Sequence, residues 1–444
     1  MSARPGAIEY NISLNNFKGE TGDISNIVAE FNIYEDIFSS VLKADILVQD
    51  AEGLPEAFPI VGDETINIQF KTDSSTDQVK LKFRVYTLAD RVVAKEREHQ
   101  YVLHAVSEEM FDNLLDYTNN YFVGKKPNEI VQAVFDEYLN KGGKKLEVET
   151  CINKFSATGA RHHPFAFINL IATEAQSEEF PDSSFYIFYE DHIGFKFKSL
   201  NKLFNADPVE KYYLADPSAG DTMAKDKGDI RQYQIITALS FERSFDIMKG
   251  LTGGMLDTTV AYIDPIMKKY EESTFKYIAD FDKLSNIPGS GGGKPILPKE
   301  GKFASTKGNS HMRMIATDFN DEGTQDFTGR ISEGTDPHKY HSSKRWKWYH
   351  NGLALLQSLH QYGINITVPG NSNIKCGDIV NIFIPENSPV ETDDAVKYLK
   401  LFGQEKAKFL VTAVLHNYKR TTGDYFTTIQ GVKQSLDVDI KSQA

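Results

Sequence analysis

The sequence predicts a β-rich α+β fold in which two related antiparallel β-barrel domains are interrupted by α/β insertion domains. Three observations lead to this prediction. Apolar and polar residues alternate over the first 108 residues, the period becomes helical over 109–175, and three segments near the start recur in order near the end. A period of two places one face of a strand on a core, and a period near 3.6 does the same for a helix.

Residues 1–108 are expected to form the first barrel. Three runs in this region place apolar side chains at every second position: Ile8, Tyr10, Ile12 and Leu14; Leu42, Ala44, Ile46 and Val48; Ile66, Ile68 and Phe70. Turn-forming residues lie between the runs, namely Gly53, Pro55, Pro59 and Gly62. Short alternating runs divided by turns are typical of an antiparallel barrel or sandwich.

Residues 109–203 are expected to form an α/β insertion domain. A first helix is predicted after Pro127, because the apolar positions that follow have helical spacing: Ile130, Val131, Val134, Phe135, Tyr138 and Leu139. Proline is tolerated in the first helical turn, where its missing N–H is harmless, and Pro164 opens a second predicted helix in the same way. The segment 185–200 returns to alternation around Glu190–Gly194, which indicates a hairpin.

The second barrel is predicted in two parts, over 204–250 and 344–436. The first part contains a strand at 232–241. The second part contains a helix near 345–360 and strands at 364–368, 379–384, 407–416 and 424–432.

Between the two parts we expect an insertion domain over 251–343. Its segment 286–301 holds five glycines and three prolines, which is typical of a flexible connector or exposed loop. Residues 437–444 are expected to form a C-terminal tail.

An internal repeat connects the two predicted barrels. The segment GDETINIQF (62–70) aligns with GDIVNIFI (377–384) after one gap, and KFRVYTLADR (82–91) aligns with KFLVTAVLHN (408–417). A returning strand that begins with tyrosine follows in each case. Glycine tolerates a positive φ and aspartate can bond to its own backbone, so both suit a turn before a strand. The predicted structural turns of the repeat are Gly62, Asp63, Pro369, Gly370, Gly377 and Asp378.

The overall composition narrows the function. The chain is 40% apolar and 12% aromatic, and its formal net charge of −13 disfavours a protein that binds nucleic acid by neutralising phosphates. Two distant cysteines, Cys151 and Cys376, argue against a disulfide framework or a thiolate metal site. The start of the chain lacks a secretory signal, and no apolar run spans a bilayer. We therefore expect a soluble protein made in the cytosol.

Three motifs that suggest a phosphate, calcium or zinc site have simpler structural interpretations. PGSGGGKP (288–295) resembles a phosphate-binding loop but has prolines where glycine and Ser/Thr are needed, so a linker is favoured. The acidic segment 318–329 resembles a calcium loop but ends in Gly329 instead of a bidentate Glu, which favours a solvated loop. His338 and His341, with His311 and His350, are expected to be surface histidines and not zinc ligands.

The segment SSKRWKWYH (342–350) mixes basic and aromatic residues, as single-stranded nucleic-acid sites do. The favoured reading is a helix start whose tryptophans anchor on a neighbouring element. Carboxylate pairs are unavoidable among 62 acidic residues and carry little information. We identify no hydrolase motif, so no catalytic, cofactor-binding or metal-binding residue is predicted, no cofactor is expected, and the chain is not expected to be an enzyme.

Several segments together resemble the baseplate central hub subunit of contractile-tailed bacteriophages. Residues 31–70 are similar to the family's first barrel, 185–203 to the hairpin before its second barrel, and 366–385 to a strand pair of related spike and hub proteins. The most distinctive segment is 245–277, whereas 286–301 and the loop to about 340 resemble nothing known.

The resemblance implies two tail-tube-like barrels in each chain and a homotrimer that forms a pseudo-six-fold ring. Such a ring adapts a six-fold tail tube to a three-fold central spike and lines the DNA conduit. The implied partners are further copies of the chain, the spike protein, tube or tube-initiator proteins and surrounding baseplate proteins, while DNA passes without specific binding. The implied location is the virion tail baseplate, assembled in the host cytoplasm. Two alternatives stay open: the hub portion of a contractile injection or secretion spike, and a tail-tip cell-wall hydrolase.

Overall fold

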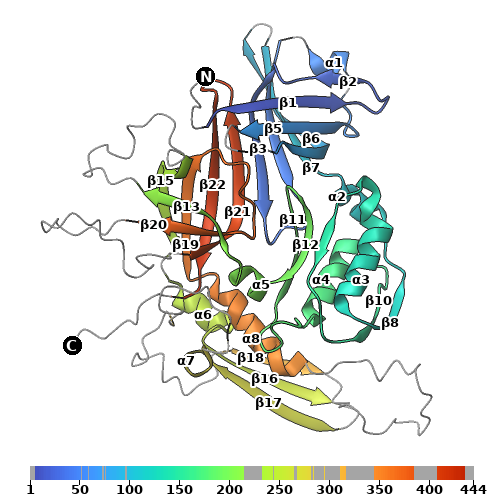
Figure 1. Cartoon of the computed structure of the whole chain (residues 1–444). Helices are drawn as coiled ribbons and strands as arrows, with labels where there is room; N and C mark the ends of the chain where they lie inside the picture. Colours follow the sequence, from blue (N-terminus) through green and yellow to red (C-terminus); the bar gives the residue numbers. More distant parts are fainter. Residues whose placement is uncertain are drawn as a thin grey trace, which may run out of the picture.

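The structure is a computed structural model of the 444-residue chain (Figure 1). It describes residues 6–51, 53–58, 60–72, 75, 77–95, 98–214, 233–243, 245–264, 268–281, 284, 295, 311–316, 345–384 and 408–435. In that part of the chain, no helix combines the length and the apolar character needed to cross a bilayer. The fold is β-rich α+β, as the sequence predicted: a 14-stranded sheet dominates it, together with three smaller sheets and several helices.

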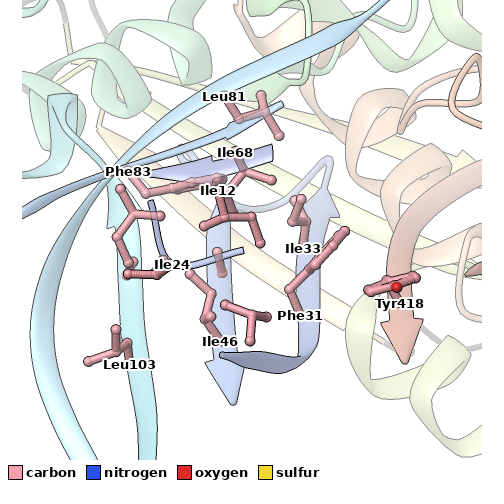
Figure 2. Packing of buried hydrophobic residues seen from close by; sticks show 14 of the residues in the cluster. Ile12, Ile24, Phe31, Ile33, Ile46, Ile68, Leu81, Phe83, Leu103 and Tyr418 are labelled. Carbon is pink, nitrogen blue, oxygen red and sulfur yellow. The ribbon is translucent and has the colours of Figure 1, made fainter. Parts of the chain in front are cut away.

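The first half of the large sheet comes from the start of the chain. Its elements are β1 (Ile8–Asn15), β2 (Thr21–Asp23), β3 (Val28–Asp36), β4 (Lys43–Asp50), the short helix α1 (Leu54–Ala57), β5 (Thr65–Thr72), β6 (Val79–Lys95) and β7 (Glu98–Ser107). The strands alternate buried and partly exposed side chains, which is the alternation that the sequence showed. Figure 2 shows the resulting core, in which side chains such as Ile12, Ile46 and Phe83 meet.

The second half of the sheet comes from two distant parts of the chain. It contains β13 (Pro208–Leu214), β14 (Ile235–Ile236), β15 (Ala238–Arg243), β19 (Tyr362–Pro369), β20 (Ile379–Phe383), β21 (Lys408–Lys419) and β22 (Asp424–Lys433). A separate core fills this half, with Ile366, Ile382 and Phe409 among its fully buried members.

The two halves repeat the same strand order. In the first half the hydrogen-bonded order is β3-β4-β7-β6-β5, and in the second half it is β15-β19-β22-β21-β20. Corresponding strands also follow one another in the same order along the chain. The edge strand differs, because β1 runs antiparallel to β5 whereas β13 runs parallel to β20.

The register of the repeat agrees with the sequence alignment. Asn67 lies opposite Lys82 in the first half, and Asn381 lies opposite Lys408 in the second. The ladder shifts register just after Val85 in β6 and just after Val411 in β21, which are equivalent positions. A shared irregularity at one place in two ladders is stronger support for a repeat than shared apolar residues, because bulges are specific local features.

The two halves are joined edge to edge. Strand β3 pairs antiparallel with β21, so the blue and red strands in Figure 1 belong to one continuous sheet. The sequence predicted a closed barrel for residues 1–108, but the described ladders leave this half open. The reason is that the outer edge of β3 bonds to β21 instead of returning to β1 or β2. In the second half, β14 pairs with β13 and β15 pairs with β19. Only Thr237 separates β14 from β15, so this segment connects the two outer strands of that half.

An insertion follows β7 and packs beside the seam between the halves. It consists of α2 (Glu109–Leu115), β8 (Tyr121–Lys125), α3 (Pro127–Val134), a π-helical turn (Phe135–Leu139), a 3-10 turn (Asn140–Gly142), β9 (Leu146–Val148), β10 (Phe155–Thr158), α4 (Pro164–Glu174), β11 (Tyr186–Asp191), β12 (Gly194–Ser199) and α5 (Leu200–Phe204). The predicted helices after Pro127 and Pro164 and the predicted hairpin at 190–194 are confirmed. Phe135, Phe165 and Phe195 are among the residues of its core.

A second, smaller unit interrupts the second half of the sheet. It comprises α6 (Ile247–Gly253), β16 (Asp257–Asp264), β17 (Lys269–Lys276), α7 (Tyr277–Asp280), β18 (His311–Ala316) and α8 (Arg345–Ser358). Strand β16 is central, with β17 antiparallel on one side and β18 parallel on the other. Apolar residues of α8 pack with Leu410 and Val432 of the second half, so the two are held by one core.

Candidate functional site: the seam between the two halves

The seam is a ladder of seven residue pairs between β3 and β21, from Asp36 opposite Ala413 to Glu30 opposite Lys419. Side chains reinforce the backbone ladder. Asn417 donates hydrogen bonds from Nδ2 to Glu30 Oε1 at 2.7 Å and to Asn32 Oδ1 at 2.6 Å. Because these contacts join residues almost 400 positions apart, the seam fixes the two halves relative to each other.

The side chain of Tyr418, from β21 at the seam, lies in the core of the first half. Its ring centroid lies 4.6 Å from that of Tyr10 and 5.2 Å from that of Phe31, and the residue is 6% exposed. Figure 2 shows it at the edge of the first-half cluster, on a strand of the other half. Burying an aromatic ring of one half in the core of the other stabilises their association.

A buried polar cluster lies where three parts of the molecule meet. Glu35 of β3 places Oε1 2.7 Å from Nδ1 of His192, at the tip of the β11–β12 hairpin, and 3.5 Å from Nε2 of His416 on β21. The side chain of Glu35 is fully buried, and the two histidine side chains are 9% and 1% exposed. Cys376 donates its backbone N–H to the other carboxylate oxygen at 3.1 Å.

The electrostatics of this cluster favour a charged carboxylate. Burial alone acts to raise the pKa of Glu35, but the neighbouring His192 and His416 hold the pKa of the carboxyl well below its usual range. Burial acts to lower the pKa of His192, yet the adjacent Glu35 carboxylate raises it overall. His416 Nδ1 lies 2.6 Å from the hydroxyl of Tyr425, so that hydroxyl orients the ring.

A second buried ionic group attaches the insertion to the first half. Lys144 Nζ contacts Glu109 Oε2 at 2.7 Å and Glu190 Oε1 at 2.5 Å. The other oxygen of Glu190 accepts the backbone N–H of Leu42 at 2.9 Å. Burial acts to lower the pKa of Lys144, but its two carboxylate partners raise it. The insertion is thus held beside the seam by two polar groups near the tip of the hairpin β11–β12, one through Glu190 and one through His192.

The first of the predicted turns lies immediately before β5. Gly62 has a φ of +97° and donates its N–H to Glu64 Oε2 at 2.8 Å. Asp63 is turned toward the surface and forms an ion pair with Arg84 of β6. By strand register, it is Glu64 that occupies the position equivalent to Asp378, since their carbonyls accept the N–H groups of the equivalent residues Val85 and Val411.

The remaining predicted turn residues lie around β19 and β20. Pro369 ends β19, and Gly370 follows it in close contact with the ring of Tyr425. Gly377 has a φ of +88° and donates its N–H to Val411 at 2.8 Å. Asp378 accepts the N–H of Lys375 at 3.2 Å. These residues form the loop that places the backbone N–H of Cys376 beside Glu35.

Several candidates named from the sequence lie outside the described residues, and others lie elsewhere in the fold. The glycine-rich loop around 288–294, the acidic segment 318–329, His338 and His341, and the tail 437–444 lie outside the described residues. Trp348 is buried on α8, as expected for an anchoring side chain, and His350 is buried as well, which corrects its expected surface position. Cys151 and Cys376 are both buried free thiols and are not joined by a disulfide.

Sequence reasoning missed Glu35, His192 and His416. No motif joins them, because they come from three elements that only the folded chain brings together. The one available signal is chemical: an acidic residue within the apolar alternation of a predicted strand needs a partner if it is buried.

Comparison with solved structures defines the class of fold. The tail protein of Neisseria meningitidis MC58 aligns over 96% of this chain and 96% of its own, with a TM-score of 0.53 and 9% identity. The 43 kDa tail protein of prophage MuSo2 from Shewanella oneidensis aligns over 97% of this chain and 100% of its own, with a TM-score of 0.52 and 10% identity. The chain therefore has the fold of these tail proteins.

Comparison of sequences narrows the class. No family model matches the chain. A curated relative, the probable baseplate hub protein gp334 of Vibrio phage KVP40, is 22% identical over 368 residues, which cover 80% of each protein. Together with the shared fold and the resemblance seen in the sequence, this match supports a baseplate-hub-type protein.

Proposed function

We propose that the chain is a structural hub that assembles as a homotrimeric, pseudo-six-fold ring and adapts a six-fold tail tube to a three-fold central spike. The observation that carries this proposal is the repeated strand order of the two halves, β3-β4-β7-β6-β5 and β15-β19-β22-β21-β20. A chain with two similar halves offers two similar surfaces, so three chains offer six. The continuous ladder at the seam supports the proposal, because an adaptor must hold its two halves at a fixed angle.

The proposed partners follow from this geometry. One face of the ring would contact tail tube or tube-initiator proteins, the opposite face the spike protein, and the rim the surrounding baseplate proteins. The ring would be assembled in the host cytoplasm and carried in the virion. The net charge of −13 supports a conduit that DNA passes without binding, because an acidic surface repels phosphates.

We propose no enzymatic activity for this hub. The buried clusters described above join parts of the molecule, and their carboxylates are paired with a lysine or a histidine. Incubation of the pure protein with peptidoglycan tests this: no clearing is expected, and clearing that is lost on changing a single acidic residue would establish a hydrolase.

Light scattering on the full-length protein tests the proposed assembly. One chain has a mass of 50.0 kDa, so the trimer is expected at about three times that value. A monomer that persists at micromolar concentration, both alone and with the spike protein, would contradict the proposal.

A further inference from the structure

The Glu35 cluster has the composition and shape of a metal site. Each of Glu35, His192 and His416 offers one ligand-type atom, and all three atoms lie within 4.8 Å of one another. Carboxylate oxygen and imidazole nitrogen are a donor set that suits Zn²⁺ and similar divalent transition-metal ions. We propose that these three side chains bind a divalent transition-metal ion of the Zn²⁺ type at the junction of the two halves and the insertion.

The first supporting observation is an unsatisfied buried atom. Nε2 of His416 lies 3.5 Å from Glu35 Oε1, at the long limit of a hydrogen bond, and makes no well-formed hydrogen bond within the described part of the chain, although the residue is only 1% exposed. Leaving a buried polar atom unpaired is costly, so such atoms point to a missing partner. A metal ion between His416 and Glu35 would supply that partner.

The surrounding contacts resemble those that orient metal ligands. The other ring nitrogen of His416 is engaged by the hydroxyl of Tyr425 at 2.6 Å, which leaves Nε2 free for a metal. The second oxygen of Glu35 accepts the N–H of Cys376 at 3.1 Å. Metal-binding histidines and carboxylates are commonly held in this way by a second layer of hydrogen bonds.

The distances require only a small adjustment. Metal–ligand bonds of about 2.0–2.1 Å place the donor atoms of a tetrahedral site about 3.3 Å apart. The 3.5 Å between Glu35 Oε1 and His416 Nε2 is close to this spacing. The 2.7 Å between Glu35 Oε1 and His192 Nδ1, at the tip of the β11–β12 hairpin, must lengthen by about 0.6 Å to reach this spacing.

The local charge also suits a cation. Among the described residues, Glu35 and the buried Asp191 are anionic groups near His192, and Lys375 is a cationic group near it. Asp191 also pairs with Lys196 at 3.7 Å, so the charge of a bound divalent ion would be compensated mainly by Glu35 and only in part by Asp191. It would also join β3, the β11–β12 hairpin and β21 through one centre, and so act as a structural clip at the seam.

Metal content of the full-length protein tests the proposal. The protein is stripped with a chelator, dialysed against Zn²⁺ and analysed by elemental mass spectrometry. We expect a single Zn²⁺ per chain and a higher thermal midpoint than in the stripped protein. His416→Ala and Glu35→Gln should lose the bound ion and the shift in thermal midpoint.

His104→Ala is the matched control. His104 also lies beside a carboxylate, with Nδ1 2.5 Å from Asp45 Oδ1, but this pair is partly exposed and includes no second histidine. The control should retain Zn²⁺ like the wild type. Zinc retained equally by His416→Ala, or no zinc retained by the wild type, would overturn the proposal.

X-ray absorption at the zinc edge of the wild-type protein gives a test that does not depend on the folding of a variant. A shell of nitrogen and oxygen at about 2.0–2.1 Å is expected. A sulfur contribution at about 2.3 Å would assign the ion to a cysteine and would also contradict the proposed ligands.

Discussion

Asn417 of β21 donates a hydrogen bond to the side-chain oxygen of Asn32 on β3 over 2.6 Å, and the two residues are direct partners in the ladder between the halves. The halves of the sheet are therefore not separate domains connected by a linker. They share backbone hydrogen bonds, so they should unfold as one cooperative unit. The following predictions concern this seam and the groups that attach the insertion to it.

Replacing Tyr418 with alanine should destabilise the whole β structure. The ring is 6% exposed and packs against Tyr10 and Phe31 of the other half. Removing a buried aromatic ring typically costs about 3–5 kcal/mol. Urea denaturation would measure the loss, with Tyr121→Ala as the control, because Tyr121 is 77% exposed. Similar midpoints for both variants would show that the contact across the seam is unimportant.

Gly370→Ala should be destabilising because of its contact with Tyr425. An added Cβ would lie 1.8 Å from Cδ1 of the fully buried Tyr425 ring, far inside van der Waals contact. Forcing extra atoms into a packed region costs about 1–3 kcal/mol. At Gly22 the nearest atom to an added Cβ would be 4.0 Å away, so Gly22→Ala should have a much smaller effect on the thermal midpoint. Equal effects would contradict the predicted clash.

Lys144→Met should destabilise the insertion at the point where Glu190 also accepts the N–H of Leu42 from the first half. The substitution removes the cation from Glu109 and Glu190, whose side chains are 2% and 1% exposed. Breaking a buried pair on one side costs about 3–5 kcal/mol, because the remaining charge is uncompensated. Lys202 pairs with Glu179 at an exposed site, so Lys202→Met should cost less than about 1 kcal/mol. Denaturant midpoints that fall equally in both variants would refute this ranking.

Glu108 should contribute a pH-dependent part of the stability. Burial acts to raise its pKa, but Lys82 at 2.7 Å and Arg84 at 2.8 Å lower the pKa below the ordinary 4.5. A carboxyl with a lowered pKa in the folded state stabilises the protein above its unfolded pKa. That contribution is lost as the pH falls through the folded pKa.

Glu108→Gln should therefore reduce stability at neutral pH, and the difference from the wild type should shrink as the pH falls below 4.5. Urea titrations at several pH values would measure this difference. Glu178→Gln, at an exposed position, controls for the loss of one carboxylate. A difference for Glu108→Gln that stays constant with pH would show that the ion pair is not responsible.

Much of the strand and helix content could be predicted from local sequence pattern. The alternation at Ile66, Ile68 and Phe70 corresponds to β5, and the apolar positions after Pro127 correspond to α3. Asn381 and Lys408 could be matched to Asn67 and Lys82 from the alignment alone. These features succeed because they depend on neighbours in the chain.

Features that depend on distant pairing could not be predicted. Nothing in residues 208–214 indicates that β13 runs parallel to β20, or that the edge of β3 bonds to β21. The Glu35 cluster was missed for the same reason, since its members gain meaning only when three elements meet. The sequence alignment matched Asp63 to Asp378, whereas the register of the ladders matches Glu64 to Asp378. The alignment gap was therefore misplaced by one residue.

The proposed symmetry has a direct test in electron microscopy of the assembled ring viewed along its axis. If three chains each contribute two quasi-equivalent halves, averaged images should show a closed ring with three-fold symmetry and six similar densities around an open centre. An assembly without a central opening, or one in which the two halves of each chain occupy unlike radial positions, would contradict the proposed adaptor.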